Sequence, residues 1–175
     1  GAGTAPGLSA LIAARAAQRM REPEKQQCWL EHAKTDDPRT ESATLMLDAE
    51  MANEERRFDE ALAALEKLQG KQGRHIAALR LEMRARQGLG DWDGVLKLVR
   101  QLVKRDALPP EVVREVRTQA HLGNIAKCAA DQGKLTAYLR SVPEEELGCR
   151  VVLAAARALV AQGGEAPAQK LIESV

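Results

Sequence analysis

Apolar residues recur along the chain three, four and seven positions apart, which is the spacing of one buried helix face. The two clearest segments begin at Phe58 and Trp92, and partial copies surround Trp29 and Ala168. Phe58 and Trp92 are 34 residues apart, and the segment around Trp29 fits the same frame displaced by 35. The pattern therefore predicts amphipathic helices that repeat at a fixed interval. The apolar positions are Phe58, Ala61, Leu62, Leu65 and Leu68 in the first segment and Trp92, Val95, Leu96, Val99 and Leu102 in the second.

A period of 34 residues is that of the tetratricopeptide repeat, whose unit is a hairpin of two helices. Such a hairpin cannot bury its apolar face alone, so neighbouring hairpins must stack. We therefore predict an all-α fold, a right-handed α-solenoid of about five tetratricopeptide-like hairpins over residues 8–175, with 1–7 as a tag remnant or linker. Helices are expected near residues 8–20, 23–35, 40–54, 57–70, 74–88, 92–105, 109–130, 134–141, 143–162 and 165–175.

The predicted turns follow the same frame. Gly90 supplies a left-handed residue and Asp91 can cap the helix that begins at Trp92. Arg56 and Arg57 stand at the corresponding positions of the preceding unit, which departs from the pattern there. The fourth hairpin is expected to be irregular. Prolines open a long helix at 109 and a further helix at 143, because proline is tolerated at a helix start.

The composition narrows the classes of partner. Hydrophobic residues make up 45% of the chain but aromatic residues only 2%, and the Ala and Leu that dominate are strong helix formers. Lys and Arg number 26 against 25 Asp and Glu, so no net basic field attracts nucleic acid or an anionic membrane. No run approaches the ~18 apolar residues of a membrane span. The chain stops within a predicted helix, which suggests a fragment of a longer protein.

Motifs that carry catalysis or bind metal are absent from the sequence. It contains no Gly-x-Ser-x-Gly, no phosphate loop and no His-Glu-x-x-His. Cys28, Cys128 and Cys149 have no C-x-x-C spacing, and we expect them to be small buried residues within helices. We therefore predict a non-enzymatic protein with no catalytic residue, no metal site and no cofactor.

The first helix of each unit lines the concave face of such a stack. Ala14, Ala49 and Ala156 lie nine residues before a second helix, where a small side chain allows close helix packing. The residue after each alanine should point into the groove, where Arg side chains and amides suit carboxylates or a peptide backbone. This predicts a mildly basic protein-binding groove lined by Arg15, Gln18, Arg19, Glu50, Asn53, Arg80, Arg84 and Arg157.

Several segments occur along the chain in a fixed order. The central one is Gly90-Asp91-Trp92-Asp93 followed by Leu96-Lys97-Leu98-Val99. The others are Ala13-Ala14-Arg15-Ala16-Ala17, Trp29-Leu30-Glu31-His32-Ala33, Arg57-Phe58-Asp59-Glu60-Ala61-Leu62, Arg74-His75, Leu79-Arg80-Leu81 and the Pro-opened helix after residue 108. In this order the segments resemble the HemY family of bacterial inner-membrane proteins associated with protohaem biosynthesis, and the resemblance covers nearly all of residues 8–175.

The resemblance implies a scaffold or regulator of the enzymes of late haem and porphyrin metabolism. It also implies two membrane-spanning helices before this domain, absent from this chain, and further repeats after it. The repeat domain would then lie on the cytoplasmic side of the bacterial inner membrane. Other proteins would be its partners, with no nucleic acid and with membrane contact only through those missing N-terminal segments.

The same pathway raises one alternative, a haem or porphyrin carrier. Imidazole is a common ligand of haem iron, and the chain has His32, His75 and His121. The sequence has no C-x-x-C-H and only four aromatic residues of the kind that wall a porphyrin pocket. We therefore expect the three histidines at the surface or at helix ends, and the carrier function remains the second hypothesis.

Overall fold

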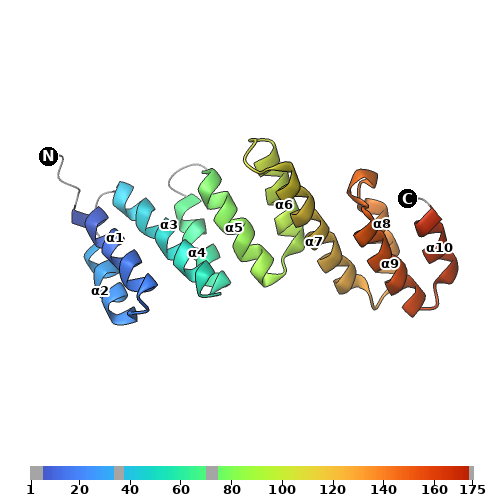
Figure 1. Ribbon diagram of the computed structural model, residues 1–175, viewed down its shortest axis with the longest axis horizontal. Coiled ribbons are helices and arrows are strands. Elements are labelled where there is room, and N and C mark those ends of the chain that lie inside the picture. Colours follow the sequence, from blue (N-terminus) through green and yellow to red (C-terminus); the bar gives the residue numbers. More distant parts are fainter. Residues whose placement is uncertain (1–5, 34–37, 70–74, 174–175) are drawn as a thin grey trace. The chain divides into compact units, whose positions relative to one another are not determined.

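The computed structural model describes residues 6–33, 38–69 and 75–173, and the regular structure of these residues is entirely helical (Figure 1). No helix in these ranges is at once long enough and apolar enough to cross a membrane. The α-helices are α1 (Pro6–Arg19), α2 (Pro23–Ala33), α3 (Pro38–Glu54), α4 (Phe58–Gln69), α5 (Ile76–Leu89), α6 (Trp92–Val103), α7 (Pro110–Cys128), α8 (Gln132–Ser141), α9 (Cys149–Ala161) and α10 (Glu165–Glu173), and a 3-10 helix, η1, spans Glu144–Glu146.

The chain forms two compact units, an N-terminal unit (Gly1–Leu89) and a C-terminal unit (Gly90–Val175). In the N-terminal unit each helix packs on the next one in sequence, and α3 also contacts both α1 and α5. In the C-terminal unit α7 is central, since it packs against α6, α8, α9 and η1. Helix α9 in turn packs against α8 and α10.

Left-handed residues lie just after α1, α3 and α5. Arg21, Arg56 and Gly90 have φ angles of 58°, 63° and 69° and are spaced 35 and 34 residues apart. After Arg21 and Arg56 the next amide donates back to the helix, from Glu22 N to Ala17 O at 3.0 Å and from Arg57 N to Ala52 O at 2.8 Å. This is the Schellman arrangement that closes a helix end. The spacing of 34 or 35 residues in the apolar pattern therefore also separates these three backbone turns.

An aromatic ring at the start of a helix packs on a glycine of the following helix in both units. Phe58 lies against Gly88 of α5, where an added Cβ would approach the ring to 2.3 Å. Trp92 lies against Gly123 of α7, where an added Cβ would approach Nε1 to 1.9 Å. The apolar pattern predicts that Trp92 is buried between its own helix and the preceding one. It is half-buried instead, and its indole packs on the helix that follows.

Small residues form much of the core, as the composition predicts. Ala14, Ala49 and Ala156 are all buried, which confirms the predicted positions of close helix packing. Asp91 also acts as predicted, because its carboxylate accepts a hydrogen bond from Gly94 N at 3.1 Å and caps α6.

The predicted helix at 143–162 is wrong in its first turn. Residues Glu144–Glu146 form η1, and α9 begins only at Cys149, with Gly148 in an extended conformation as its N-cap. Proline followed by three glutamates does favour a helix start. A tertiary contact outweighs this local preference. The Glu146 carboxylate pairs with His121 and Arg117 on α7 and holds the chain there.

The expected burial of the cysteines is also wrong for two of the three. Cys28 and Cys149 are exposed, and Cys128 is half-buried. Cys149 is the first residue of α9, so its side chain has no preceding helical turn to pack on. Burial of free cysteine is a general tendency, and here position within the helix outweighs it.

Candidate functional site

The predicted groove residues of the N-terminal unit meet first at Arg15. Arg15 Nη2 lies 2.8 Å from Glu50 Oε1 and 3.1 Å from Glu54 Oε1, so the guanidinium of α1 pairs with two carboxylates of α3. Gln18 joins the same cluster, because its amide donates to Glu54 Oε2 at 3.0 Å. Arg15 and Glu50, which the predicted frame places 35 residues apart, are thus in direct contact.

Glu54 is a member of this cluster that the sequence prediction omits. It follows Glu50 by four residues, a spacing that places two side chains on the same helix face and could have identified it. Two carboxylates therefore offset Arg15, so this part of the face is less basic than predicted.

Cavities flank the cluster on α1. One of about 500 Å³ is lined by Arg15, Arg19 and Glu50 together with apolar Leu11 and Leu47. A second, of about 560 Å³, is lined by Gln18 and Arg19 with Glu54 and Glu55. Arg19 is exposed and borders both. The surface thus offers apolar area beside charged groups, as protein-binding surfaces do.

Asn53 does not line a groove. Its side chain is only 3% exposed, and Nδ2 donates to the backbone oxygen of Leu81 at 3.0 Å, which ties α3 to α5. The other amide atom, Oδ1, is buried without a hydrogen-bond partner among the described residues. Asn53 directly precedes the exposed Glu54, but its own side chain lies in the contact between α3 and α5.

Arg80 and Arg84 are exposed and four residues apart on α5, which places them on one face of that helix. Helix α5 packs on α3, the helix that carries Glu50 and Glu54. Arg157 is exposed on α9 of the C-terminal unit. Three of the eight predicted groove residues, Arg15, Gln18 and Glu50, therefore belong to one hydrogen-bonded cluster.

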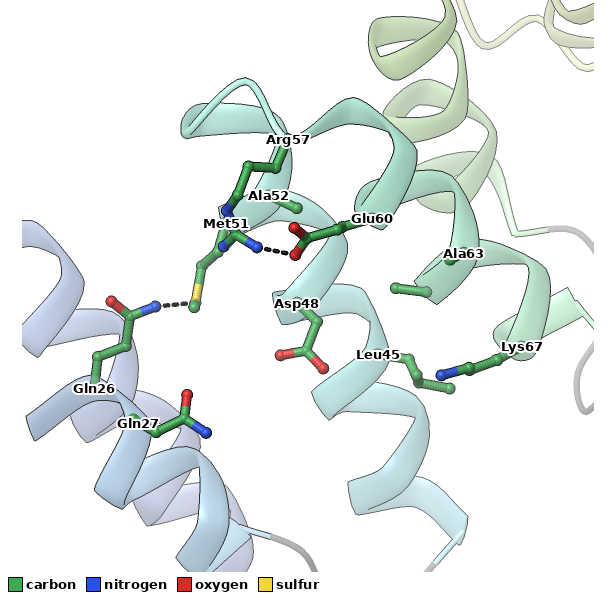
Figure 2. Close-up of a pocket in the computed structure, with 11 residues that line it drawn as sticks. Gln26, Gln27, Leu45, Asp48, Met51, Ala52, Arg57, Glu60, Ala63 and Lys67 are labelled. Atoms are coloured by element: carbon green, nitrogen blue, oxygen red, sulfur yellow. Dashed lines mark hydrogen bonds and ion pairs between the residues drawn. The ribbon is translucent and has the colours of Figure 1, made fainter. Parts of the chain in front are cut away.

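A further cavity, of about 380 Å³, lies among α2, α3 and α4 (Figure 2). Gln26 and Gln27 approach it from α2, and Asp48 lies on α3 between the other two helices. Arg57 and Glu60 are paired with each other at its edge, and Gln26 donates to Met51 Sδ at 3.6 Å. Lys67 also lines this cavity. The lining of this cavity carries both positive and negative side chains, so its charge favours neither anionic nor cationic ligands.

The C-terminal unit contains a buried polar network that the sequence did not reveal. His121, 2% exposed, lies with Nδ1 2.8 Å from Tyr138 Oη and Nε2 2.9 Å from Glu146 Oε2. Asn124 Nδ2 donates to Tyr138 Oη at 3.1 Å and to Asp93 Oδ1 at 2.9 Å. The network, hereafter the His121 network, thus connects α6, α7, α8 and η1.

The hydrogen bonds of this network fit one direction. Because Asn124 donates to Tyr138 Oη, the tyrosine hydroxyl is able to donate to His121 Nδ1, and Nε2–H then donates to Glu146. Arg117 Nη1 lies 3.2 Å from the other oxygen of Glu146. Burial raises the pKa of Tyr138, although the hydrogen bond from Asn124 opposes that rise. The tyrosine therefore stays protonated and keeps its donor role at neutral pH.

A polar stripe on α7 could have indicated the network. Arg117, His121 and Asn124 are spaced by four and three residues and so share one helix face. The expectation that the histidines lie at the surface or at helix ends is wrong for His121, which lies inside α7. It holds for His75, which is exposed immediately before α5. The side chain of His32 lies outside the described residues.

The chemistry of these residues does not favour iron binding. Both ring nitrogens of His121 are already hydrogen-bonded, so binding iron would break one of those buried bonds. Within the ranges that the structure describes, no three His, Cys, Asp or Glu side chains are grouped so as to hold a metal ion.

Comparison with known proteins yields no match for this chain, whether the chain is compared with family models, with curated proteins or with solved structures.

Proposed function

We propose that this protein is a non-enzymatic, protein-binding scaffold, built as an α-solenoid of tetratricopeptide-like hairpins. The observation that carries the proposal is the ion pair of Arg15 with Glu50 and Glu54. It joins equivalent positions of consecutive first helices and leaves a charged face flanked by cavities. In solenoids such faces are the extended surfaces that bind other proteins.

Two regularities support the repeat. Left-handed turn residues recur at Arg21, Arg56 and Gly90 with the spacing of the apolar pattern. The packing of an aromatic ring on a glycine recurs with Phe58 on Gly88 and Trp92 on Gly123. Helix α3 also contacts α1 and α5, as first helices do in a stack of hairpins.

The resemblance to the HemY family supplies the class of partner. On that resemblance we propose enzymes of late haem synthesis as the bound proteins. The domain would act on the cytoplasmic side of the bacterial inner membrane, tethered by segments outside this chain. An acidic segment of the partner would contact Arg80 and Arg84, since both are exposed on one face of α5.

Charge reversal tests this proposal directly. Binding of purified enzymes of late haem synthesis to the immobilised domain would be measured by biolayer interferometry. We expect the Arg80→Glu/Arg84→Glu variant to bind at least tenfold more weakly, with helicity and melting temperature almost unchanged. Reversal adds repulsion to the lost attraction, and tenfold corresponds to about 1.4 kcal/mol.

The matched control is Lys25→Glu/Lys67→Glu, which makes the same change of charge on α2 and α4 of the same unit. We expect this control to bind as the unaltered domain does. Equal loss from both variants would show a diffuse electrostatic effect without a groove. No loss from either variant would exclude α5 as the binding surface, and no binding by the unaltered domain would reject these enzymes as partners.

A further inference from the structure

A cavity of about 270 Å³ lies beside the His121 network in the C-terminal unit. Residues from three parts of the unit line it, namely α6, the buried His121 on α7, and α8 with the residues that follow it. Its lining is Asp93, Leu96, Lys97, Arg100, His121, Tyr138, Ser141, Val142 and Pro143. The predicted protein-binding residues are not among them.

The floor of this cavity is polar but already satisfied. The His121 ring bonds to Tyr138 and Glu146, and Tyr138 also accepts from Asn124. The Glu146 carboxylate is held by Arg117 as well, so its charge is offset away from the cavity. These bonds fix the rings in place without any ligand. The floor is therefore preorganised, which lowers the entropic cost of binding.

The wall contributed by α6 carries the charge. Lys97 and Arg100 are exposed and three residues apart, so they lie on the same side of the helix. Asp93 lines the cavity too, but its carboxylate is engaged by the Asn124 amide. Two cations against one hydrogen-bonded carboxylate leave this wall with a positive balance. A negatively charged group is the ligand that such a wall attracts.

Apart from Ser141, whose hydroxyl donates to the Tyr138 backbone oxygen, the rest of the lining is apolar. It consists of Leu96 of α6 and of Val142 and Pro143, which follow α8. Val142 is buried. An apolar lining beside two cations suits a ligand with a charged head and a short hydrocarbon body. The volume lies just below the range of drug-sized ligands, so it fits a molecule of few heavy atoms.

We propose that this cavity is a binding site for a small aliphatic carboxylate, with its head at Lys97 and Arg100 and its chain against Leu96, Val142 and Pro143. Both side chains donate charge-assisted hydrogen bonds, and Arg is suited to hold a carboxylate through two N–H groups. The site is independent of the proposed protein-binding face, because the test of that face concerns residues of the N-terminal unit. Either proposal can therefore fail without the other.

Tyr138 provides a specific reporter, since it is the single tyrosine of the chain and its ring lines the cavity. Pentanoate would be titrated into the full chain at constant ionic strength, and the Tyr138 ring resonances followed by NMR. We expect a saturable shift with a dissociation constant of about 1 mM or tighter. In the Lys97→Gln/Arg100→Gln variant that constant should rise at least tenfold.

The control variant is Lys104→Gln/Arg114→Gln, which removes the same charge from exposed positions of the same unit outside the cavity. It should bind pentanoate as the unaltered chain does. Inorganic phosphate serves as the second ligand and should bind more weakly, because it has no hydrocarbon body. The absence of a saturable shift, equal weakening in both variants, or phosphate binding as tight as that of pentanoate would each overturn the proposal.

Discussion

The N-terminal unit keeps its interhelical ion pairs at the surface, whereas the C-terminal unit buries a connected polar network. In the former, Arg15 joins α1 to α3 with its side chain 23% exposed and its carboxylate partners at 43% and 40%. In the latter, the side chains of His121 and Glu146 are only 2% and 8% exposed. Both sets of contacts join neighbouring helices, but the first is partly exposed to solvent and the second is buried.

The difference matters because solvation sets the energetic consequence of losing a partner. An exposed pair is screened by water and salt, and its removal returns each group to solvent at little cost. A buried pair has given up its hydration, so removing one member leaves the other unsatisfied in an apolar setting. We therefore expect the His121 network to tolerate substitution poorly, and the Arg15 pairs of the N-terminal unit to tolerate it well.

The largest effect is expected from His121→Ala. This substitution leaves Tyr138 and Glu146 without their shared partner in a buried site. The free energy of unfolding should fall by about 2–4 kcal/mol, because a hydrogen bond to a charged group is lost and the Tyr138 hydroxyl is left unsatisfied, whereas Arg117 still pairs with Glu146. Urea titration followed by circular dichroism measures it.

A double substitution separates this cause from simple loss of volume. In His121→Leu/Glu146→Met both members of the His121–Glu146 pair are replaced by apolar side chains, so no Glu146 carboxylate remains there without its histidine. Tyr138 loses the His121 ring in both variants, so the comparison isolates the carboxylate. The double variant should be more stable than His121→Ala. A loss below about 1 kcal/mol for His121→Ala itself would show that the network is not buried as described.

The second prediction concerns the feature that the two units share. Gly88→Ala and Gly123→Ala each place a methyl group within 2.3 Å or less of an aromatic ring, that of Phe58 or Trp92. Overpacking costs about 1–3 kcal/mol and outweighs the roughly 1 kcal/mol by which alanine favours a helix. Both variants should therefore have lower melting temperatures, in scanning calorimetry, than the unaltered chain.

Gly133→Ala is the matched control for these substitutions, because Gly133 lies in α8 and its nearest neighbour would be Asp131 Oδ1 at 3.3 Å. It should be neutral or stabilising. Should all three glycine variants behave alike, the rings would not be seated on Gly88 and Gly123.

A smaller effect, of opposite sign, is expected from Arg56→Gly. Arg56 has a φ of 63°, a left-handed conformation in which a side chain costs roughly 1 kcal/mol relative to glycine. Gly90 occupies the corresponding turn position without that strain. Arg56→Gly should therefore raise the free energy of unfolding by about 1 kcal/mol in the urea titration. If Arg57→Gly raised the free energy of unfolding by a similar amount, the effect would come from the lost charge and not from backbone strain.

The smallest effect is expected from Arg15→Ala. The pairs with Glu50 and Glu54 are partly exposed, so the free energy of unfolding should change by less than about 1 kcal/mol, and by less still in 1 M salt. The measurement is the same urea titration at two salt concentrations. A loss equal to that of His121→Ala would remove the distinction between the two units.

Local patterns were sufficient for much of the fold. The apolar spacing around Phe58 and Trp92 predicted helices, and Asp91 predicted a cap that the structure contains. Spacing by 34 or 35 residues predicted that Arg15 and Glu50 occupy equivalent positions, and they form an ion pair. These features depend on residues close in sequence or on a simple period, so sequence alone carries them.

Contacts between distant residues decided the rest. Glu144–Glu146 departs from the predicted helix because His121 and Arg117 hold Glu146, and neither residue is adjacent in sequence. Asn53 leaves the predicted groove because its amide finds the Leu81 oxygen on another helix. Propensity differences of a few tenths of a kcal/mol per residue are outweighed by one buried hydrogen bond to a charged group. Sequence by itself therefore determined most of the helical segments, while tertiary contacts determined where the chain leaves the helix before α9 and which polar side chains became buried or stayed exposed.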